Sequence, residues 1–342
     1  MALLFWSGVL LVSVWAAHWG SDKLAVPLEK LQRQWGLSEA AGAAFVALAT
    51  ASPEIGTNTA SAVQGLSDIG LGNLLGSNII SVPAIVTVAF LASRTEGSGQ
   101  KQRPELQVKV EALTIQALPY IAIIILAAIL TVPPAWRGLQ PVDGWIMLAA
   151  YAVYVAQAIL RQRQRGQRVR WGRREIAIAL LGVLVLALGA YFVVTATEKI
   201  VSILGISELI GGLFITSTLS IAPEVFATWS VARSGQVTAA TASVIADNTA
   251  TMTLAFFPLA LVTLPIENML LYSVNLAFVA IFALLYAAFI QWGKLAHSFE
   301  RWEVLTLIAV YLIYLAVIVF GVFRDLLHEL RKGQGFPISV VF

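Results

Sequence analysis

"TASPE" at residues 50–54 and "SIAPE" at residues 220–224 each place a Pro-Glu pair inside a long apolar segment. A carboxylate at the centre of a bilayer costs at least about 2.5–3.5 kcal/mol, so such a residue is by default a candidate functional group. Proline removes one helical N–H and clashes with the carbonyl one turn earlier, which breaks or kinks a helix. The two segments therefore predict a pair of interrupted membrane helices that carry a buried site.

The composition indicates a membrane protein. Of the 342 residues, 58% are hydrophobic and 12% are charged, whereas soluble proteins carry about a quarter charged residues. Runs such as 115–132 and 304–320 contain no charge over the length of a bilayer span. We predict an all-α polytopic fold with ten transmembrane helices, the first of which is a span and not a cleaved signal. The expected spans are 2–18, 36–63, 69–92, 110–132, 142–160, 175–197, 205–232, 237–264, 267–291 and 303–323.

The basic residues predict the orientation of these spans. Most of the 22 Lys and Arg residues fall in the loops after the odd-numbered spans, and seven arginines lie in the run at 161–174. Because cytoplasmic loops are enriched in Lys and Arg, both termini are expected outside the cytoplasm, in the plasma (inner) membrane. The arginine-rich loop is interpreted as a contact with anionic lipid and not with nucleic acid. No obligate protein partner is evident.

The two halves of the chain resemble each other. "GLSEAAGAAF" (36–45) matches "GISELIGGLF" (205–214), and "GNLLGSNII" (72–80) corresponds to "ASVIADNTA" (242–250). We predict a first five-helix repeat at 1–165, with signature spans in 36–92, and a second at 166–342, with signature spans in 205–264. Five is an odd number, so the second repeat must enter the membrane from the opposite face. Inverted repeats of this kind hold a substrate near the midplane between the two halves.

Three acids are expected at membrane depth: Glu54, Glu224 and Asp247. No Lys or Arg is expected at the same depth, so bound cations or protons must neutralise the carboxylates. Polar oxygens surround these acids in the same spans, and hard cations such as Ca²⁺ and Na⁺ take carboxylate, carbonyl, amide and hydroxyl ligands. The candidate site residues are Glu54, Asn78, Glu224, Asp247, Asn248, Thr50, Ser77 and Ser220.

Other polar residues are given simpler interpretations. Glu39 and Glu208 each follow a Ser at the start of a span, and Asp68 precedes a span, so all three are expected to support helix starts. The chain has no cysteine, which leaves no disulfide and no thiol chemistry. The three histidines are expected near span ends, which disfavours a His-ligated transition-metal centre. No cofactor is expected.

At the Pro-Glu segments the sequence resembles the calcium/cation antiporter superfamily, which includes the sodium/calcium exchangers. "ATASPE" with "SDIGLGNLLGSNII" is similar to its first signature, and the likeness covers both repeats. The resemblance implies that Glu54 and Glu224 bind calcium and that Asn78 supplies an amide ligand. It leaves either Asp247 or Asn248 as the ligand of the second repeat. It also implies sodium contacts at Thr50 and Ser220.

The sequence departs from the family signature where oxygen atoms would be needed for sodium. Ala49 and Leu219 replace glycines, and Ala51 and Ile221 replace serines. The expected function is a secondary antiporter, not an enzyme, that exchanges Ca²⁺ for Na⁺ by alternating access. The alternatives are a proton-coupled exchanger of Ca²⁺ or another cation, an intramembrane hydrolase, and a scaffold that transports nothing.

Overall fold

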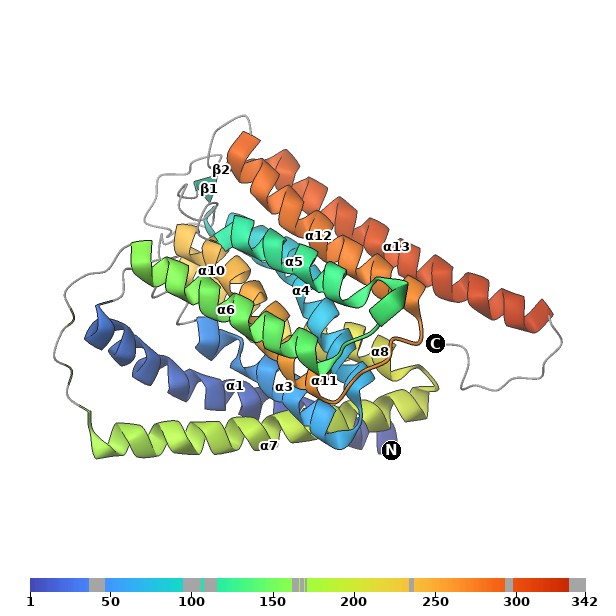
Figure 1. The fold of residues 1–342 in the computed structure, drawn as a ribbon, viewed down its shortest axis with the longest axis horizontal. Coiled ribbons are helices and arrows are strands. Elements are labelled where there is room, and N and C mark those ends of the chain that lie inside the picture. Colours follow the sequence, from blue (N-terminus) through green and yellow to red (C-terminus); the bar gives the residue numbers. More distant parts are fainter. Residues whose placement is uncertain are drawn as a thin grey trace.

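The computed structural model describes residues 1–36, 47–94, 106–107, 116–161, 166, 169, 171–233, 237–292 and 298–331. These residues are almost entirely helical (Figure 1). The first half contains α1 (Ala2–Trp35), α3 (Ser52–Gln64), α4 (Ser67–Ala92), α5 (Leu118–Thr131), the short η2 (Pro134–Trp136) and α6 (Pro141–Arg161). The second half contains α7 (Arg173–Leu204), α8 (Glu208–Ile210), η3 (Gly211–Thr216), α9 (Ser217–Arg233), α10 (Val237–Ala250), η4 (Thr251–Ala255), α11 (Phe256–Leu261), α12 (Met269–Trp292) and α13 (Arg301–Arg331).

Apart from the short turn η2 and the four helical residues 47–50, the described residues form ten helical segments. The π-helical turn η3 joins α8 to α9, and the π-helical turn η4 joins α10 to α11, so each trio runs as one helix. Within the described part of the chain, seven helices are long and apolar enough to cross a membrane, and α5 is a shorter apolar helix. The predicted all-α membrane class is confirmed. The only strands among the described residues are the two-residue β1 (Leu106–Gln107) and β2 (Ser298–Phe299).

Helix α1 is much longer than the expected span at 2–18. It continues through Pro27 to Trp35 and ends at Gly36, whose φ of 64° is the left-handed conformation that suits glycine. The added turns pack along α7, and Lys30 forms an ion pair with Glu175 of that helix. As a result His18 lies in the middle of α1, so the expectation that every histidine lies near a span end is wrong. Glu39 and His297 lie outside the described residues.

Helix contacts between the two halves occur in matched pairs. Helix α4 of the first half packs against α9 of the second. The reverse pairing also occurs, because α3, the counterpart of α9, packs against η4 and α11, the counterparts of α4. Helix α6 packs against α11, and its counterpart α13 packs against α4. Likewise α5 contacts α10, and α12 contacts α4. Exchanging the two halves therefore reproduces the pattern of contacts, as expected of two repeats related by pseudo-twofold symmetry.

Two short backbone pairings repeat this symmetry at opposite ends of the bundle. Strands β1 and β2 pair antiparallel and join the α4–α5 connection to the α12–α13 connection. Leu139 and Leu264 exchange two 2.9 Å hydrogen bonds and join the α5–α6 connection to the α11–α12 connection. The strand pair lies at the left in Figure 1, whereas the α5–α6 connection lies at the right. The two symmetry-related pairings thus lie at opposite ends of the bundle, which agrees with an inverted relationship between the repeats.

Glycines bring the two repeats together beside the site. A Cβ atom on Gly72 of α4 would collide with the backbone oxygen of Leu209, and one on Gly212 of η3 would collide with that of Ile69. The backbones of α4 and the α8–η3–α9 helix therefore cross in direct contact, which only glycine permits. This crossing fixes the position of both signature helices relative to each other.

Candidate cation-binding site

The two Pro-Glu segments differ in backbone structure. Residues 47–50 are helical, the chain turns at Ala51, and Pro53 falls in the first turn of α3, where the missing N–H costs no helical hydrogen bond. Pro223 instead lies inside α9. The irregular backbone of the second repeat lies earlier, at η3. The predicted interruption therefore occurs at the proline in the first repeat and upstream of it in the second.

The carbonyl group that loses its helical partner at Pro53 is hydrogen-bonded by side-chain hydroxyls. Proline cannot donate to the residue four positions earlier, which here is Ala49. The Ala49 oxygen accepts hydrogen bonds from the hydroxyls of Ser21 in α1 and Ser52, the latter at 2.9 Å. The Thr50 hydroxyl also bonds to the backbone oxygen of Ala47 at 3.1 Å. The Ala49 carbonyl is therefore already bonded by two hydroxyls and is not free to bind a cation.

The structure brings together the three carboxylates predicted from the sequence. Glu54 is 2% exposed, Asp247 is 6% exposed and Glu224 is partly buried. Each of the two glutamates is close enough to Asp247 for electrostatic repulsion, and Glu54 also acts on Glu224. No described Lys or Arg forms an ion pair with them. One oxygen of Glu54, Oε2, and one of Glu224, Oε1, are buried without a hydrogen-bond partner among the described residues.

Thr50 connects the two repeats at this point. Its Oγ1 donates a 2.8 Å hydrogen bond to Oδ1 of Asp247. Thr50 precedes α3 and Asp247 lies in α10, so the bond joins the signature helices of opposite repeats. The carboxylate keeps its second oxygen, and the Thr50 hydroxyl oxygen keeps a lone pair for a further ligand.

The two asparagines are bonded differently. Asn78 donates from Nδ2 to the Leu74 oxygen at 2.8 Å and to Thr251 Oγ1 at 3.2 Å, and its Oδ1 accepts from Tyr120 at 2.8 Å. Asn248 Oδ1 accepts from Ser81 at 2.9 Å, while its Nδ2 is buried without a partner among the described residues. The Asn248 oxygen is thus bonded to Ser81, whereas Asp247 lies beside Thr50 and both glutamates.

Among the described residues, neither serine hydrogen-bonds to any of the three carboxylates. Ser77 bonds weakly to its own helix, at 3.3 Å from the Leu74 oxygen. Ser220 donates to Asn73 Oδ1 at 3.4 Å, and Asn73 donates to Asn58 Oδ1 at 3.1 Å. Ser220 therefore belongs to a buried polar chain that runs from α9 through α4 to α3. Asn58 was not predicted, although its place four residues after Glu54 on one helix face could have indicated it.

Further polar groups were missed because they come from helices without a signature. Tyr120 of α5 is fully buried and bonds to Asn78. His18 and Ser21 of α1 approach the signature helices at the backbone of Ser220 and Ala49. His18 bonds through Nδ1 to the Val14 oxygen at 2.9 Å. Nothing in the sequence around these residues indicated which helices would be neighbours.

The helix-start residues are placed as follows. Ser207 caps α8 by accepting a 3.3 Å hydrogen bond from the backbone N–H of Ile210, and Glu208 lies in the first turn. Asp68 lies in the first turn of α4. These positions confirm the helix-start interpretation for Glu208 and Asp68.

The described residues hold no group of three or more His, Cys, Asp or Glu side chains close enough to bind a metal ion by themselves. A cation held by Glu54, Asp247 and Glu224 would therefore also need neutral oxygens from amides, hydroxyls or backbone. Such a mixed set suits a cation that must leave again better than a permanently bound metal.

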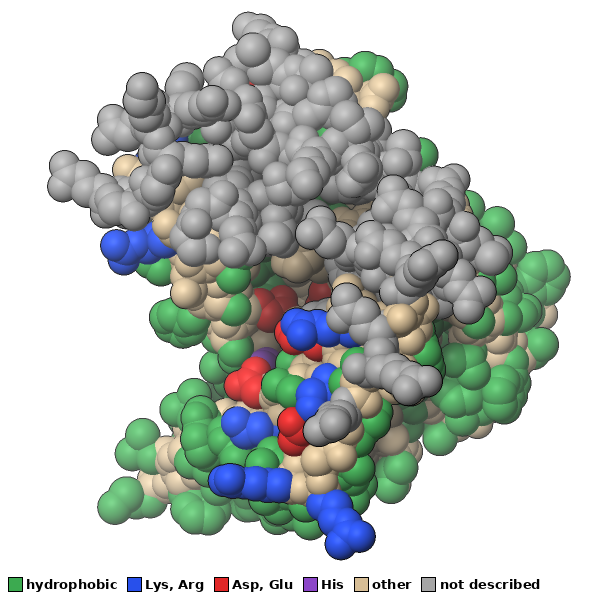
Figure 2. All heavy atoms as spheres, turned by 90° about the vertical axis from the view of Figure 1, so that its left-hand side faces the viewer, with side chains coloured by type: hydrophobic (Ala, Val, Ile, Leu, Met, Phe, Trp, Pro, Cys, Tyr) green, Lys and Arg blue, Asp and Glu red, His purple; other side chains and the backbone are tan. Residues whose placement is uncertain are grey.

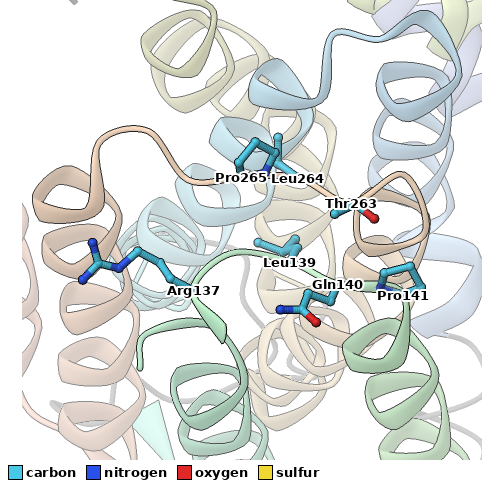
Figure 3. A pocket seen from close by; sticks show the side chains of 7 residues that line it. All are labelled: Arg137, Leu139, Gln140, Pro141, Thr263, Leu264 and Pro265. Carbon is cyan, nitrogen blue, oxygen red and sulfur yellow. The ribbon is translucent and has the colours of Figure 1, made fainter. Parts of the chain in front are cut away.

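The surface is hollowed at one end of the bundle. Figure 2 shows the face at the left of Figure 1, where acidic side chains are visible in a hollow that has Lys and Arg side chains on its border. A separate pocket lies between the α5–α6 and α11–α12 connections (Figure 3) and is lined by Arg137, Leu139, Gln140, Pro141, Thr263, Leu264 and Pro265. Its one charged group is a cation, so this pocket is no candidate for binding another cation.

Comparison with known proteins agrees with this arrangement. A family model described as "Sodium/calcium exchanger protein" matches residues 5–160 and 175–320. The membrane protein MJ0091 of Methanocaldococcus jannaschii is 24% identical over 329 residues, covering 93% of this chain and 100% of its own. The sodium/calcium exchanger MaX1 of Methanosarcina acetivorans is 39% identical over 75 residues, which are 22% of this chain and 21% of its own.

Solved structures show the same fold. The sodium-calcium exchanger NCX_Mj soaked with 2.5 mM Na⁺ and 10 mM Sr²⁺ matches with a TM-score of 0.64 and 22% identity, over 92% of this chain and 99% of that one. The same protein soaked without Na⁺ and Ca²⁺ matches with a TM-score of 0.59 and 21% identity, again over 92% and 99%. At this identity the likeness establishes the fold.

Proposed function

Because the chain belongs to the sodium/calcium exchanger protein family, we propose that it exchanges Ca²⁺ for Na⁺ at the site between its two repeats. The observation that supports this most directly is the pair of buried glutamate oxygens, one in each repeat, that have no hydrogen-bond partner in the described part of the chain. A buried, unpaired carboxylate oxygen is costly unless a cation or a proton binds it. Glu54 and Glu224 would be the principal calcium ligands, with Asp247 between them.

The remaining candidates take supporting roles in this proposal. Asn78 would supply its amide oxygen through the lone pair that Tyr120 leaves free. Asp247 is preferred to Asn248 as the ligand of the second repeat because it bonds to Thr50 and lies within electrostatic range of both glutamates. Thr50 orients Asp247. Ser77 and Ser220 border the site and would contribute hydroxyl oxygens after a change of rotamer.

Exchange follows from competition for one set of charges. Three carboxylates at close range repel one another, so a single divalent ion or several monovalent ions must neutralise them together. Ca²⁺ and Na⁺ would then exclude each other from the site. Alternating access would carry the loaded site from one face to the other through relative movement of parts of the two repeats. We assign residues 1–165 and 166–342 to these repeats.

A proton-coupled exchanger is the second candidate, and one observation favours it. Ala51 and Ile221 are both buried and have no oxygen in their side chains, and Leu219 packs against the apolar side chains of α1 and α7. Fewer hydroxyl oxygens mean fewer ligands for Na⁺, whereas protons need only the carboxylates. An intramembrane hydrolase disagrees with membership in a family of exchangers.

Transport by the purified protein tests these proposals. In proteoliposomes, a Na⁺ gradient is expected to drive ⁴⁵Ca²⁺ uptake, and Glu54→Gln or Glu224→Gln is expected to abolish it. Uptake that follows an imposed pH step and ignores the Na⁺ gradient would select the proton-coupled alternative. Unchanged exchange in both variants would reject the proposed ligands.

A further inference from the structure

Two tyrosines of α6 cover one side of the candidate site. Tyr151 and Tyr154 pack with Ala51 and Ala250 in one buried cluster, and their ring centroids are 6.0 Å apart. Ala51 follows Thr50 directly, and Ala250 lies one helical turn after Asp247. The two rings therefore pack against residues that are close in sequence to both partners of the Thr50–Asp247 hydrogen bond.

The hydroxyl of Tyr154 has no structural use in this arrangement. Tyr154 is 4% exposed, and its hydroxyl oxygen is buried without a hydrogen-bond partner among the described residues. Four other buried tyrosines each use the hydroxyl: Tyr120 with Asn78, Tyr272 with Thr131, Tyr286 with Thr241 and Tyr314 with Asn275. A buried hydroxyl without a partner is unfavourable, and phenylalanine would fill the same space without that cost.

Neutral oxygens collect around Asp247 on this side. Thr50 donates to its Oδ1, and Tyr151 is close enough to act on Asp247 electrostatically. Ala51 faces the same cluster and supplies no oxygen. One carboxylate with several neutral hydroxyls is a ligand set for a hard monovalent cation, whereas a divalent ion needs more of the carboxylates.

We propose that Tyr154, next to Tyr151, supplies a neutral oxygen ligand for the monovalent cation at the α6 side of Asp247, where residue 51 offers none. The inference rests on the proposed exchange function and extends it, because it names a specificity-determining residue outside the signature helices. When Na⁺ binds, the ion becomes the partner of the Tyr154 hydroxyl oxygen. Ca²⁺ depends chiefly on Glu54 and Glu224, so the hydroxyl distinguishes the two cations.

The test is Tyr154→Phe, an isosteric change that removes only the hydroxyl. Thermal unfolding of the purified protein is measured in choline chloride and in NaCl. We expect an unchanged or higher unfolding temperature in choline chloride, because an unpartnered hydroxyl is lost, and a smaller stabilisation by NaCl. In proteoliposomes the KM for Na⁺ should rise about 3- to 10-fold, the worth of a hydrogen-bond-sized contact. The KM for Ca²⁺ should stay within about twofold. Tyr151→Phe should shift the KM for Na⁺ in the same direction.

Two further variants separate a ligand from a packing role. The double variant Ala51→Ser/Tyr154→Phe regains a hydroxyl at residue 51, in the cluster that also contains the ring of residue 154. Its affinity for Na⁺ should recover. Tyr286→Phe is the matched control, since its hydroxyl bonds at 3.2 Å to the backbone of Thr241. It should lower the unfolding temperature equally in both salts and leave the KM for Na⁺ unchanged.

The proposal is overturned if Tyr154→Phe behaves like this control, or if it alters the KM for Ca²⁺ and the KM for Na⁺ alike. Failure of the proposed exchange function looks different: the wild type itself would show no Na⁺-driven ⁴⁵Ca²⁺ uptake and no stabilisation by NaCl. That result would reject both the function and this inference. Normal exchange in the wild type with an indifferent Tyr154→Phe variant would reject the inference alone.

Discussion

Thr50 of the first repeat donates a 2.8 Å hydrogen bond to Asp247 of the second, so this bond joins the two halves of the chain at the candidate site. Asp247 in turn lies within electrostatic range of Glu54 and Glu224. The Thr50 hydroxyl thereby orients Asp247, the acid that interacts with both Glu54 and Glu224. Changes at residue 50 should therefore affect cation binding more than folding.

Thr50→Val is expected to raise the KM for Ca²⁺ by about 10- to 100-fold, the usual effect of losing a group that orients a metal ligand. Valine keeps the shape of the side chain and removes the donor. ⁴⁵Ca²⁺ uptake in proteoliposomes measures the change. Thr249→Val is the control, because the buried Thr249 hydroxyl bonds only within its own helix, at 2.7 Å from the Ile245 oxygen. Equal effects of the two substitutions would contradict the special role of Thr50.

Glu54→Gln and Glu224→Gln should each lower kcat/KM for Ca²⁺ by more than about 100-fold. A residue that binds the ion directly contributes more to affinity than a residue that only orients a ligand. Each change also removes a buried charge without a salt-bridge partner. The unfolding temperature in the absence of cations should therefore stay the same or rise. Thermal unfolding with and without CaCl₂ separates these effects. A variant that loses stability without cations and still gains the full stabilisation from CaCl₂ would exclude that glutamate as a ligand.

Much of this arrangement could be predicted from the sequence. Acids inside apolar segments are expensive, so Glu54, Glu224 and Asp247 stand out without any structural knowledge. The spacing of the repeats and their odd number of spans predict an inverted pair, and the paired helix contacts agree with it. Hydrophobic length locates spans well because the bilayer imposes one thickness on all of them.

The parts that could not be predicted depend on which helices become neighbours. Helix α1 runs on to Trp35 because it packs along α7, and no local signal ends a span at residue 18 once that support exists. Tyr120, Tyr151 and Tyr154 resemble ordinary membrane tyrosines until α5 and α6 are seen beside the signature helices. The bonding of the Ala49 carbonyl to Ser21 likewise depends on a helix from elsewhere in the chain.

Gly212→Ala should lower the free energy of unfolding by about 1–3 kcal/mol, the usual cost of overpacking. Its Cβ would collide with the backbone oxygen of Ile69 and lie 2.9 Å from the backbone nitrogen of Asn73, neither of which can move alone. Chemical denaturation in detergent measures the change. Gly8→Ala in α1 is the matched control, because a Cβ there meets nothing within 4 Å. It should stabilise the protein by about 0.5–1 kcal/mol through helix propensity. A destabilised Gly8→Ala variant together with a neutral Gly212→Ala variant would contradict the close crossing of the repeats.

The orientation in the membrane gives the last prediction, and the absence of cysteine from the chain makes it simple to test. Trp171 lies in the arginine-rich loop and Trp136 lies in the α5–α6 connection, and both tryptophans are exposed, so each can be replaced by cysteine for labelling. These connections are at opposite ends of the bundle (Figure 1). If the arginine-rich loop is cytoplasmic, a membrane-impermeant maleimide should label Trp136→Cys in intact cells and Trp171→Cys only after permeabilisation. The reverse pattern would invert the proposed topology and place both termini in the cytoplasm. Labelling of both variants in intact cells would contradict the opposite placement of the two connections.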